Sequence, residues 1–360
     1  MGGSPTLNPA ASPAERTRAL TAHAFGLGFD AVGVAALGVP ETWDAYAAWL
    51  EAGRHASMQY LEGDGARLRH DSRLPHPGAT HAIVVAASYG GREPSGPVAR
   101  YARGDDYHEV LRERLRELHR WLETSLGRAV NARPYVDSSP ILERDLAQRA
   151  GLGWFGKNTM LITPSAGSFL FVASLFVELE LEASAPFEAD RCGTCTRCLD
   201  ACPTGALPAP RQLDASRCIS YLTIEHREAI PVELRESFGG LLYGCDICND
   251  VCPWNKRFAR DAMLPAFAPR DLFADTSSNE GTRALAREIL MMTAADYAEA
   301  FRGSAMKRAK LWMLQRNACV VLGNVGTADD LAVLEAMGEH EHPIVAEHAA
   351  WARHSITRDR

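Results

Sequence analysis

The sequence predicts an α+β protein of several domains, and three observations support that prediction. Two apolar runs with strand character, residues 83–89 (IVVAASY) and 169–179 (FLFVASLFVEL), flank a long leucine-faced helix. Eight cysteines then fall between Cys192 and Cys252, where periodic segments are short. Beyond them the pattern is helical only. We therefore expect a mixed α/β domain at residues 13–190, a cysteine module at 191–258 and a helical domain at 259–360.

The composition limits the classes of function. The 360 residues are 46% apolar, enough for several cores, and carry a formal net charge of -7. That charge argues against a generally basic nucleic-acid-binding protein but leaves room for a local basic face. We recognise no signal peptide or membrane-spanning run, and we expect a cytosolic, monomeric protein with no membrane contact. In the cytosol, cysteines serve more often as metal ligands or catalytic groups than as disulfides.

The first domain should contain one strong amphipathic helix, at residues 106–127. Its apolar face repeats at helical spacing and consists of Leu111, Leu115, Leu118, Leu122 and Leu126. Asp106 stands at the start of this helix and is a good N-cap, although a substrate contact by Asp106, Tyr101 or His108 is the alternative. The run at 83–89 ends at Gly90 and Gly91, as expected of a buried strand that enters a turn.

The cysteine spacing predicts two [4Fe–4S] clusters in a ferredoxin-like module. The first run is C-x2-C-x2-C-x3-C-P, made by Cys192, Cys195, Cys198 and Cys202 before Pro203. The second run, Cys245, Cys248 and Cys252 before Pro253, lacks only the first cysteine, which Cys218 can supply. In two-cluster modules the fourth cysteine of each run binds the other cluster. Cluster one therefore takes Cys192, Cys195, Cys198 and Cys252, and cluster two takes Cys202, Cys218, Cys245 and Cys248.

Two zinc sites are the alternative, because paired C-x2-C units also bind zinc. Zinc requires neither the third cysteine at the same spacing nor the terminal Cys-Pro, so the clusters are favoured. The ninth cysteine, Cys319, stands on an apolar helix face and is expected to be a buried core thiol.

The helical domain contains two similar segments, residues 316–323 (RNACVVLG) and 347–354 (EHAAWARH), 31 residues apart. This spacing is typical of HEAT-like helical pairs, and an ordinary bundle is the alternative. Residues 302–316 contain Arg302, Lys307, Arg308, Lys310 and Arg316 without any acidic residue. This stretch, with Trp312, predicts an RNA-binding surface; a solvated helix face with a core tryptophan is the alternative.

Several stretches together resemble one family, the epoxyqueuosine reductases, which are cobalamin-dependent iron–sulfur enzymes of queuosine biosynthesis. They are residues 100–108 (RYARGDDYH), 135–144 (YVDSSPILER), 149–163 (RAGLGWFGKNTMLIT), 218–225 (CISYLTIE), 242–246 (LYGCD) and 315–317 (QRN). The resemblance covers roughly residues 20–355 and implies a tRNA substrate that carries epoxyqueuosine in its anticodon loop. The electron donor is not identified by it.

The resemblance also implies a cobalamin bound in the first domain against the cysteine module. Leu161, Ser220, Cys245 and Asp246 would lie along it, together with Asp137. Opening an epoxide leaves an alkoxide that must be protonated, and the family motif places its proton donor at Asp137. A buried position beside the corrin would raise the pKa of Asp137. An N-cap role before a helix at residues 141–150 is the alternative for the sequence Asp137-Ser-Ser-Pro.

Two other classes of protein remain possible at this point. Reductive dehalogenases combine the same cluster module with cobalamin, but usually carry a twin-arginine signal and a membrane partner. A ferredoxin-type electron-transfer subunit would explain the cysteines alone, but not the residues on either side of them.

Overall fold

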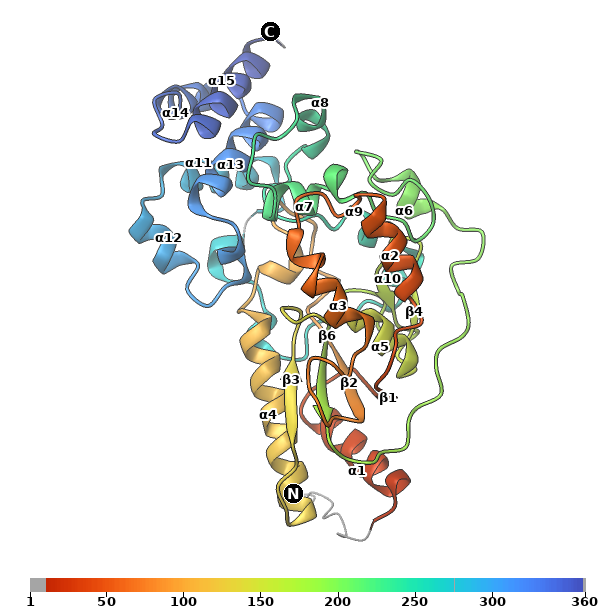
Figure 1. The fold of residues 1–360 in the computed structure, drawn as a ribbon. Helices are drawn as coiled ribbons and strands as arrows, with labels where there is room; N and C mark the ends of the chain where they lie inside the picture. The colour runs from red at the N-terminus through yellow and green to blue at the C-terminus, as the bar shows by residue number, and fades with distance from the viewer. Residues whose placement is uncertain (1–10, 275, 359–360) are drawn as a thin grey trace.

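An antiparallel sheet lies at the centre of the first domain (Figure 1). The structure, a computed structural model, describes residues 11–274 and 276–358. The four strands of the sheet follow the order β1 (Ala31–Ala36), β2 (His81–Ser88), β6 (Leu170–Val177) and β3 (Ala132–Tyr135). The two apolar runs seen in the sequence are its central strands, β2 and β6. In the register, Ile83 of β2 faces Val34 of β1 on one side and Leu175 of β6 on the other.

Helices cover both faces of this sheet, which explains why its central strands are apolar throughout. Ile83 and Val85 belong to the core shared with α1 (Pro13–Gly26) and α4 (Tyr107–Leu126). Ala82 and Val84 alternate with them and pack with α5 (Glu143–Arg149) on the opposite face. The predicted helix 106–127 is α4, and Asp106 is its N-cap, accepting a hydrogen bond from the His108 backbone N–H at 3.0 Å.

The cysteine module has little regular structure of its own. Its helices contain four to six residues each: α6 (Arg197–Asp200), α7 (Ile219–Ile224), α8 (Val232–Arg235), α9 (Ile247–Asp250) and α10 (Pro253–Phe258). A two-stranded hairpin, β4 (Trp154–Phe155) and β5 (Leu161–Ile162), borders it. Helices α2 (Trp43–Glu51) and α3 (Asp64–His70) lie in the connection from β1 to β2.

The C-terminal region is helical, as predicted, and α13 is its central helix. The helices are α11 (Asn279–Met291), α12 (Ala294–Ala300), α13 (Leu311–Val325), α14 (Leu331–Met337) and α15 (Pro343–Arg358). The two similar segments fall on α13 and α15, which pack against each other; a HEAT-like repeat remains a prediction. Cys319 on α13 has no exposed surface, which confirms a core thiol. Among the described helices, none combines the length and apolar content required to cross a bilayer.

One apolar core runs through the predicted domain boundaries. The largest cluster of buried side chains extends from Leu20 on α1 through Leu115 on α4 to Leu314 on α13 and Ala349 on α15. The first and last regions therefore form one packed unit with the module against it, and the boundaries at 190 and 258 remain predictions about the sequence.

Arg316 corrects one expectation about the basic stretch, because its side chain is buried completely. Its guanidinium donates to the backbone carbonyls of Leu222, His226 and Glu228, at 2.7 Å in each case. It also donates to the side-chain oxygen of Asn317 at 2.9 Å. Burial lowers the pKa of Arg316 to about 9. This arginine joins α13 to the cysteine module and does not contact phosphate.

Replacing Arg316 by alanine should destabilise the protein severely. Three carbonyls of the module would lose a buried donor, and each buried acceptor left unsatisfied costs about 1–3 kcal/mol. Chemical unfolding followed by circular dichroism measures the loss. Arg302→Ala, at an exposed position of the same basic stretch, is the control and should change the free energy of unfolding by about 0.5 kcal/mol or less. Equal effects of the two variants would contradict a structural role for Arg316.

Candidate functional site

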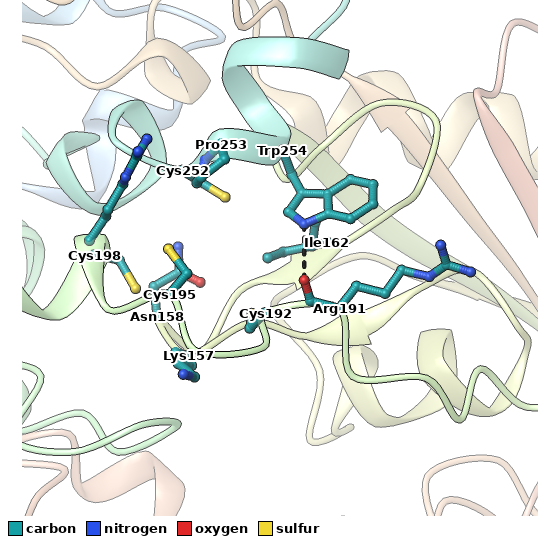
Figure 2. A pocket seen from close by; sticks show the side chains of 11 residues that line it. Lys157, Asn158, Ile162, Arg191, Cys192, Cys195, Cys198, Cys252, Pro253 and Trp254 are labelled. Atoms are coloured by element: carbon teal, nitrogen blue, oxygen red, sulfur yellow. Dashed lines mark hydrogen bonds between the residues drawn. The ribbon is translucent and has the colours of Figure 1, made fainter.

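Four of the module's eight cysteines gather around one hollow, and they are the four predicted to bind the first cluster; the assignment of ligands to clusters remains a prediction. Cys192, Cys195, Cys198 and Cys252 line one hollow of about 250 Å³ (Figure 2). The predicted second group is Cys202, Cys218, Cys245 and Cys248, of which Cys218 and Cys245 pack against one apolar core. Cys252 follows Cys245 and Cys248 in the sequence but lies with the first group in space, as expected of a two-cluster module.

The local fold brings these cysteines together through short turns and helix starts. Helices α6 and α9 carry the two runs and pack against each other. Cys252 precedes Pro253, the first residue of α10, so the proline starts a helix that leads the chain away from the hollow. Burial raises the pKa of the Cys245 thiol to about 12. Iron ligation would therefore have to provide the charge that keeps such a thiol deprotonated. The hollow and its four sulfurs suit a [4Fe–4S] cluster.

The tight loop between α5 and β4 contains Gly151 and Gly153, and both glycines are required sterically. A Cβ at Gly153 would lie 2.0 Å from the carbonyl oxygen of Ile162. Gly151 adopts φ +79°, which L side chains rarely adopt. The loop thereby places the β4–β5 hairpin, and Trp154 on it, beside Cys192.

Asp137 lies at the end of β3, in a short loop that leads to α5. Its carboxylate oxygen Oδ2 accepts a hydrogen bond from the Tyr107 hydroxyl at 2.5 Å and lies 3.5 Å from His108 Nε2. Its backbone N–H donates to Glu143 Oε1 at 2.7 Å. Because the N-cap of α5 is Leu142 and the carboxylate contacts α4 instead, the capping interpretation of Asp137 is wrong.

The backbone of Asp137 is left-handed, with φ +54°. Aspartate tolerates this region better than most residues, although a side chain there still costs about 1 kcal/mol or more. The contacts to Tyr107 and Glu143 hold the loop in this conformation. The side chain nevertheless reaches solvent, with 62% of its surface exposed.

The ionisable side chains around Asp137 shift one another's pKa values. Desolvation alone would lower the pKa of His108, but hydrogen bonds to Asp106 and Asp137 raise it to about 9. Hydrogen bonds from His108 and Tyr107 hold the pKa of Asp137 below its usual value. Burial, and then the charge of Asp137, raise the pKa of Glu143 to about 8. At neutral pH this group therefore contains a carboxylate at Asp137 with protonated neighbours.

Another group of residues extends this region towards the other domains. Arg308 forms a two-point ion pair with Glu225, at 2.8 and 2.9 Å, and its guanidinium lies 5.6 Å from the centre of the Tyr60 ring. The charge of Asp137 contributes to the pKa values of both Tyr60 and Arg308. Residues from the first domain, the module and the helical domain thus meet near Asp137.

The other four residues predicted to contact the cofactor differ in burial and in their partners. Ser220 is half-buried on α7, and Cys245 belongs to the second cysteine group. Leu161 is buried within the β4–β5 hairpin. Asp246 accepts hydrogen bonds from the backbone and the guanidinium of Arg100, at 2.9 and 3.0 Å. The Asp246 side chain is therefore held by Arg100 within the protein.

Sequence reasoning did not assign roles to Tyr107 and Glu143. Both lie in stretches that carried the family resemblance, residues 100–108 and 135–144, but no local pattern links them to Asp137. Tyr107 is 30 positions away in the chain, and only the packing of α4 beside β3 joins them.

Comparison with known proteins extends these observations to the whole chain. Residues 191–255 match the family model described as "4Fe-4S double cluster binding domain", and residues 69–138 match "Epoxyqueuosine reductase QueG, DUF1730". An epoxyqueuosine reductase of Pseudomonas aeruginosa is 36% identical over 96% of this chain and 96% of its own length. The chain belongs to the epoxyqueuosine reductase family. The reductive dehalogenase and electron-transfer alternatives are accordingly not favoured.

Solved structures of epoxyqueuosine reductases share the fold. One, in complex with an epoxyqueuosine-modified tRNA-Tyr stem loop, has a TM-score of 0.83 and 31% identity, and the match covers 94% of this chain and 89% of that one. Another, from Bacillus subtilis, has its catalytic aspartate loop swung out of the active site, with a TM-score of 0.81, 31% identity and coverage of 94% and 90%. The family thus accounts for the mixed α/β fold and its cluster-binding part.

Replacing Asp137 by asparagine should lower the pKa of His108 from about 9 towards its ordinary value near 6.5. A carboxylate favours the imidazolium beside it, and a neutral amide does not, so the titration must move to lower pH. Histidine ring NMR measures the shift, with His108→Gln identifying the signal. Glu109→Gln is the control, because Glu109 pairs with Arg112 on the same helical turn. An unmoved titration in Asp137→Asn would show that the two side chains do not interact.

Proposed function

We propose that this chain reduces the epoxide of epoxyqueuosine in tRNA to the alkene of queuosine, in the cytosol, as the last step of queuosine biosynthesis. The observation that carries the proposal is the position of Asp137, which is held by Tyr107 and Glu143 and lies 3.5 Å from His108. Membership of the epoxyqueuosine reductase family supports the same reaction. The net change consumes two electrons and two protons, and the epoxide oxygen leaves as water.

Electrons would enter through two [4Fe–4S] clusters, supplied by a donor that is not identified. Four cysteines line one hollow, which supports a cluster there, and the module's other four are proposed to bind the second cluster. Cobalamin would lie between the Asp137 region and the module, near Ser220 and Cys245, and Leu161 and Asp246 would contribute backbone contacts. The exposed Asp137 and half-buried Ser220 fit such a position. Reduced cobalamin would supply the nucleophile that opens the epoxide.

Asp137 is the proposed acid for the oxygen released by ring opening. Its depressed pKa means that the carboxylate is ionised in the arrangement described, so it must receive a proton before donating one. The His108 imidazolium, 3.5 Å away, is the nearest charged donor and can recharge it. A substrate and corrin that exclude water would raise the pKa of Asp137 and favour this transfer.

Asp137→Asn should lower turnover by about two to four orders of magnitude, the usual contribution of a positioned acid. The amide retains shape and polarity, so clusters, cobalamin and tRNA should bind as before. Turnover of epoxyqueuosine-containing tRNA is measured with excess chemical reductant, and cobalt and iron are quantified in the same samples. A variant that keeps its metals and near-normal turnover would exclude Asp137 from the mechanism.

Anaerobic reconstitution should give eight irons per chain, because eight cysteines form two groups of four. Iron and zinc analysis with an absorption spectrum measures the content. Cys218→Ala should damage one cluster and leave the other. Cys319→Ala is the matched control and should leave the iron content unchanged, because this thiol lies in the apolar core. Two zinc ions per chain without iron would contradict the proposal.

The tRNA surface is proposed to include the exposed part of the basic stretch, which excludes the buried Arg316. Arg302, Lys307, Arg308 and Lys310 are exposed, and Arg308 approaches the Asp137 region through Glu225 and Tyr60. Trp312 is half-buried and stacks on His342, with ring centres 4.1 Å apart, so it belongs to the helical packing. Phosphates of the anticodon stem can contact the four cations while the modified base enters near Asp137.

Replacing Lys307, Arg308 and Lys310 together by alanine should weaken tRNA binding and flatten its dependence on salt. Each cation that contacts a phosphate releases counterions from the RNA, and their number sets how steeply affinity falls with salt concentration. Losing three such contacts therefore makes the slope shallower. Binding of the modified stem loop at several salt concentrations measures this slope. Arg116→Ala/Arg120→Ala on α4 removes exposed charges elsewhere and is the control. A slope equal to that of the unmodified protein would place the RNA on another surface.

A further inference from the structure

The indole of Trp154 makes a hydrogen bond to a cysteine of the first group. Its Nε1–H donates to Cys192 Sγ, with 3.5 Å between nitrogen and sulfur. Trp154 is 2% exposed, so water cannot readily satisfy this N–H. A buried indole N–H normally has an acceptor, and the acceptor here is a cluster-ligand sulfur.

A second tryptophan in the same apolar cluster has a different hydrogen-bond partner. Trp254 lies edge to face with Trp154, with ring centres 4.9 Å apart. Its Nε1–H donates to the backbone carbonyl of Arg191 at 3.3 Å, the bond drawn in Figure 2. Both rings pack among apolar groups beside Cys192 and Cys252, so both exclude water from the first group. Of these two tryptophans, only Trp154 directs its N–H to a sulfur.

We propose that Trp154 sets the reduction potential of the cluster bound at Cys192, Cys195, Cys198 and Cys252. Adding one electron to a [4Fe–4S] cluster increases its negative charge, and part of that charge lies on the ligand sulfurs. An N–H donor at a sulfur stabilises the reduced form more than the oxidised form, and therefore raises the potential. The inference rests on the proposed presence of a cluster in this group.

The location of the hydrogen bond gives it a role in electron entry. The first cysteine group lines a surface hollow that also contains Lys157, Arg191 and Arg197. Cys218 and Cys245 of the second group instead pack against an interior core with Phe238 and Val320. Electrons from an external donor would reach the first group before the second. A higher potential there makes acceptance of the electron easier, opposing the effect of the apolar rings, which disfavour added charge.

The test compares Trp154→Phe with Trp254→Phe. Both variants replace an indole by a smaller ring in the same apolar cluster, and only the first removes the bond to sulfur. Anaerobically reconstituted proteins are titrated with a reductant while the clusters are followed by EPR. In Trp154→Phe the midpoint potential of one cluster should become more negative and that of the other should stay. In Trp254→Phe neither should become more negative. An unmoved potential in Trp154→Phe, or an equal negative shift in both variants, would overturn the proposal.

If Trp154→Phe is unstable, the hydrogen bond can be detected in the protein without that substitution. Protein labelled with ¹⁵N in its tryptophan indoles is reduced, and pulsed EPR detects nitrogen nuclei coupled to the cluster. The unmodified protein and Trp254→Phe should both show the indole coupling, and its absence from both would overturn the proposal. Iron analysis before each titration separates the two levels of inference. A protein without iron contradicts the proposed clusters, whereas intact clusters with unmoved potentials contradict only the role of Trp154.

Discussion

A buried guanidinium without a carboxylate partner is the constraint on which the arrangement of this molecule depends. Removing such a group from water costs several kcal/mol unless its donors are satisfied. Arg316 meets that requirement only while the carbonyls of Leu222, His226 and Glu228 converge on α13. The next residue, Asn317, donates to the carbonyls of Thr223 and Leu242. One helical turn of α13 thus fixes both ends of the segment between Cys218 and Cys245. The position of the helical region and the spacing of the second cysteine group are consequently coupled.

The Asp137 region shows the same dependence on distant parts of the chain. Asp137 stands on a loop with left-handed backbone, and partners on α4 and α5 hold it there. The ion pair of Arg308 with Glu225 and its contact with Tyr60 bring the module and the helical region to the same place. A substrate entering here would contact all three regions at once. The site is therefore a product of domain packing, and no single domain contains it.

The sequence predicted those features whose signals are local. Strands β2 and β6 follow from apolar runs and α4 from leucine spacing, and the cysteine intervals predicted the four thiols that line one hollow. It failed where one residue has two plausible local roles. Arg316 reads as one more cation in a basic stretch, and only the long-range carbonyls around it show that it is buried. Asp137 reads equally well as a cap, and its partner Tyr107 is separated from it by 30 residues. Asp246 falls in a motif near the proposed cofactor, yet its side chain is held by Arg100, 146 residues away.

The crossed cysteine groups have a consequence for how the protein is made. On the proposed assignment, one group is completed by Cys248 and the other by Cys252, although the first ligand is already present at Cys192. During synthesis, neither group is complete until nearly the whole module has left the ribosome, and then both are completed within four residues. The helical region, with the arginine that fixes the module, is synthesised only afterwards. A cluster inserted into a nascent chain would thus bind a module that α13 does not yet hold in place. The helices synthesised later would pack well only on a module whose cysteines are correctly placed.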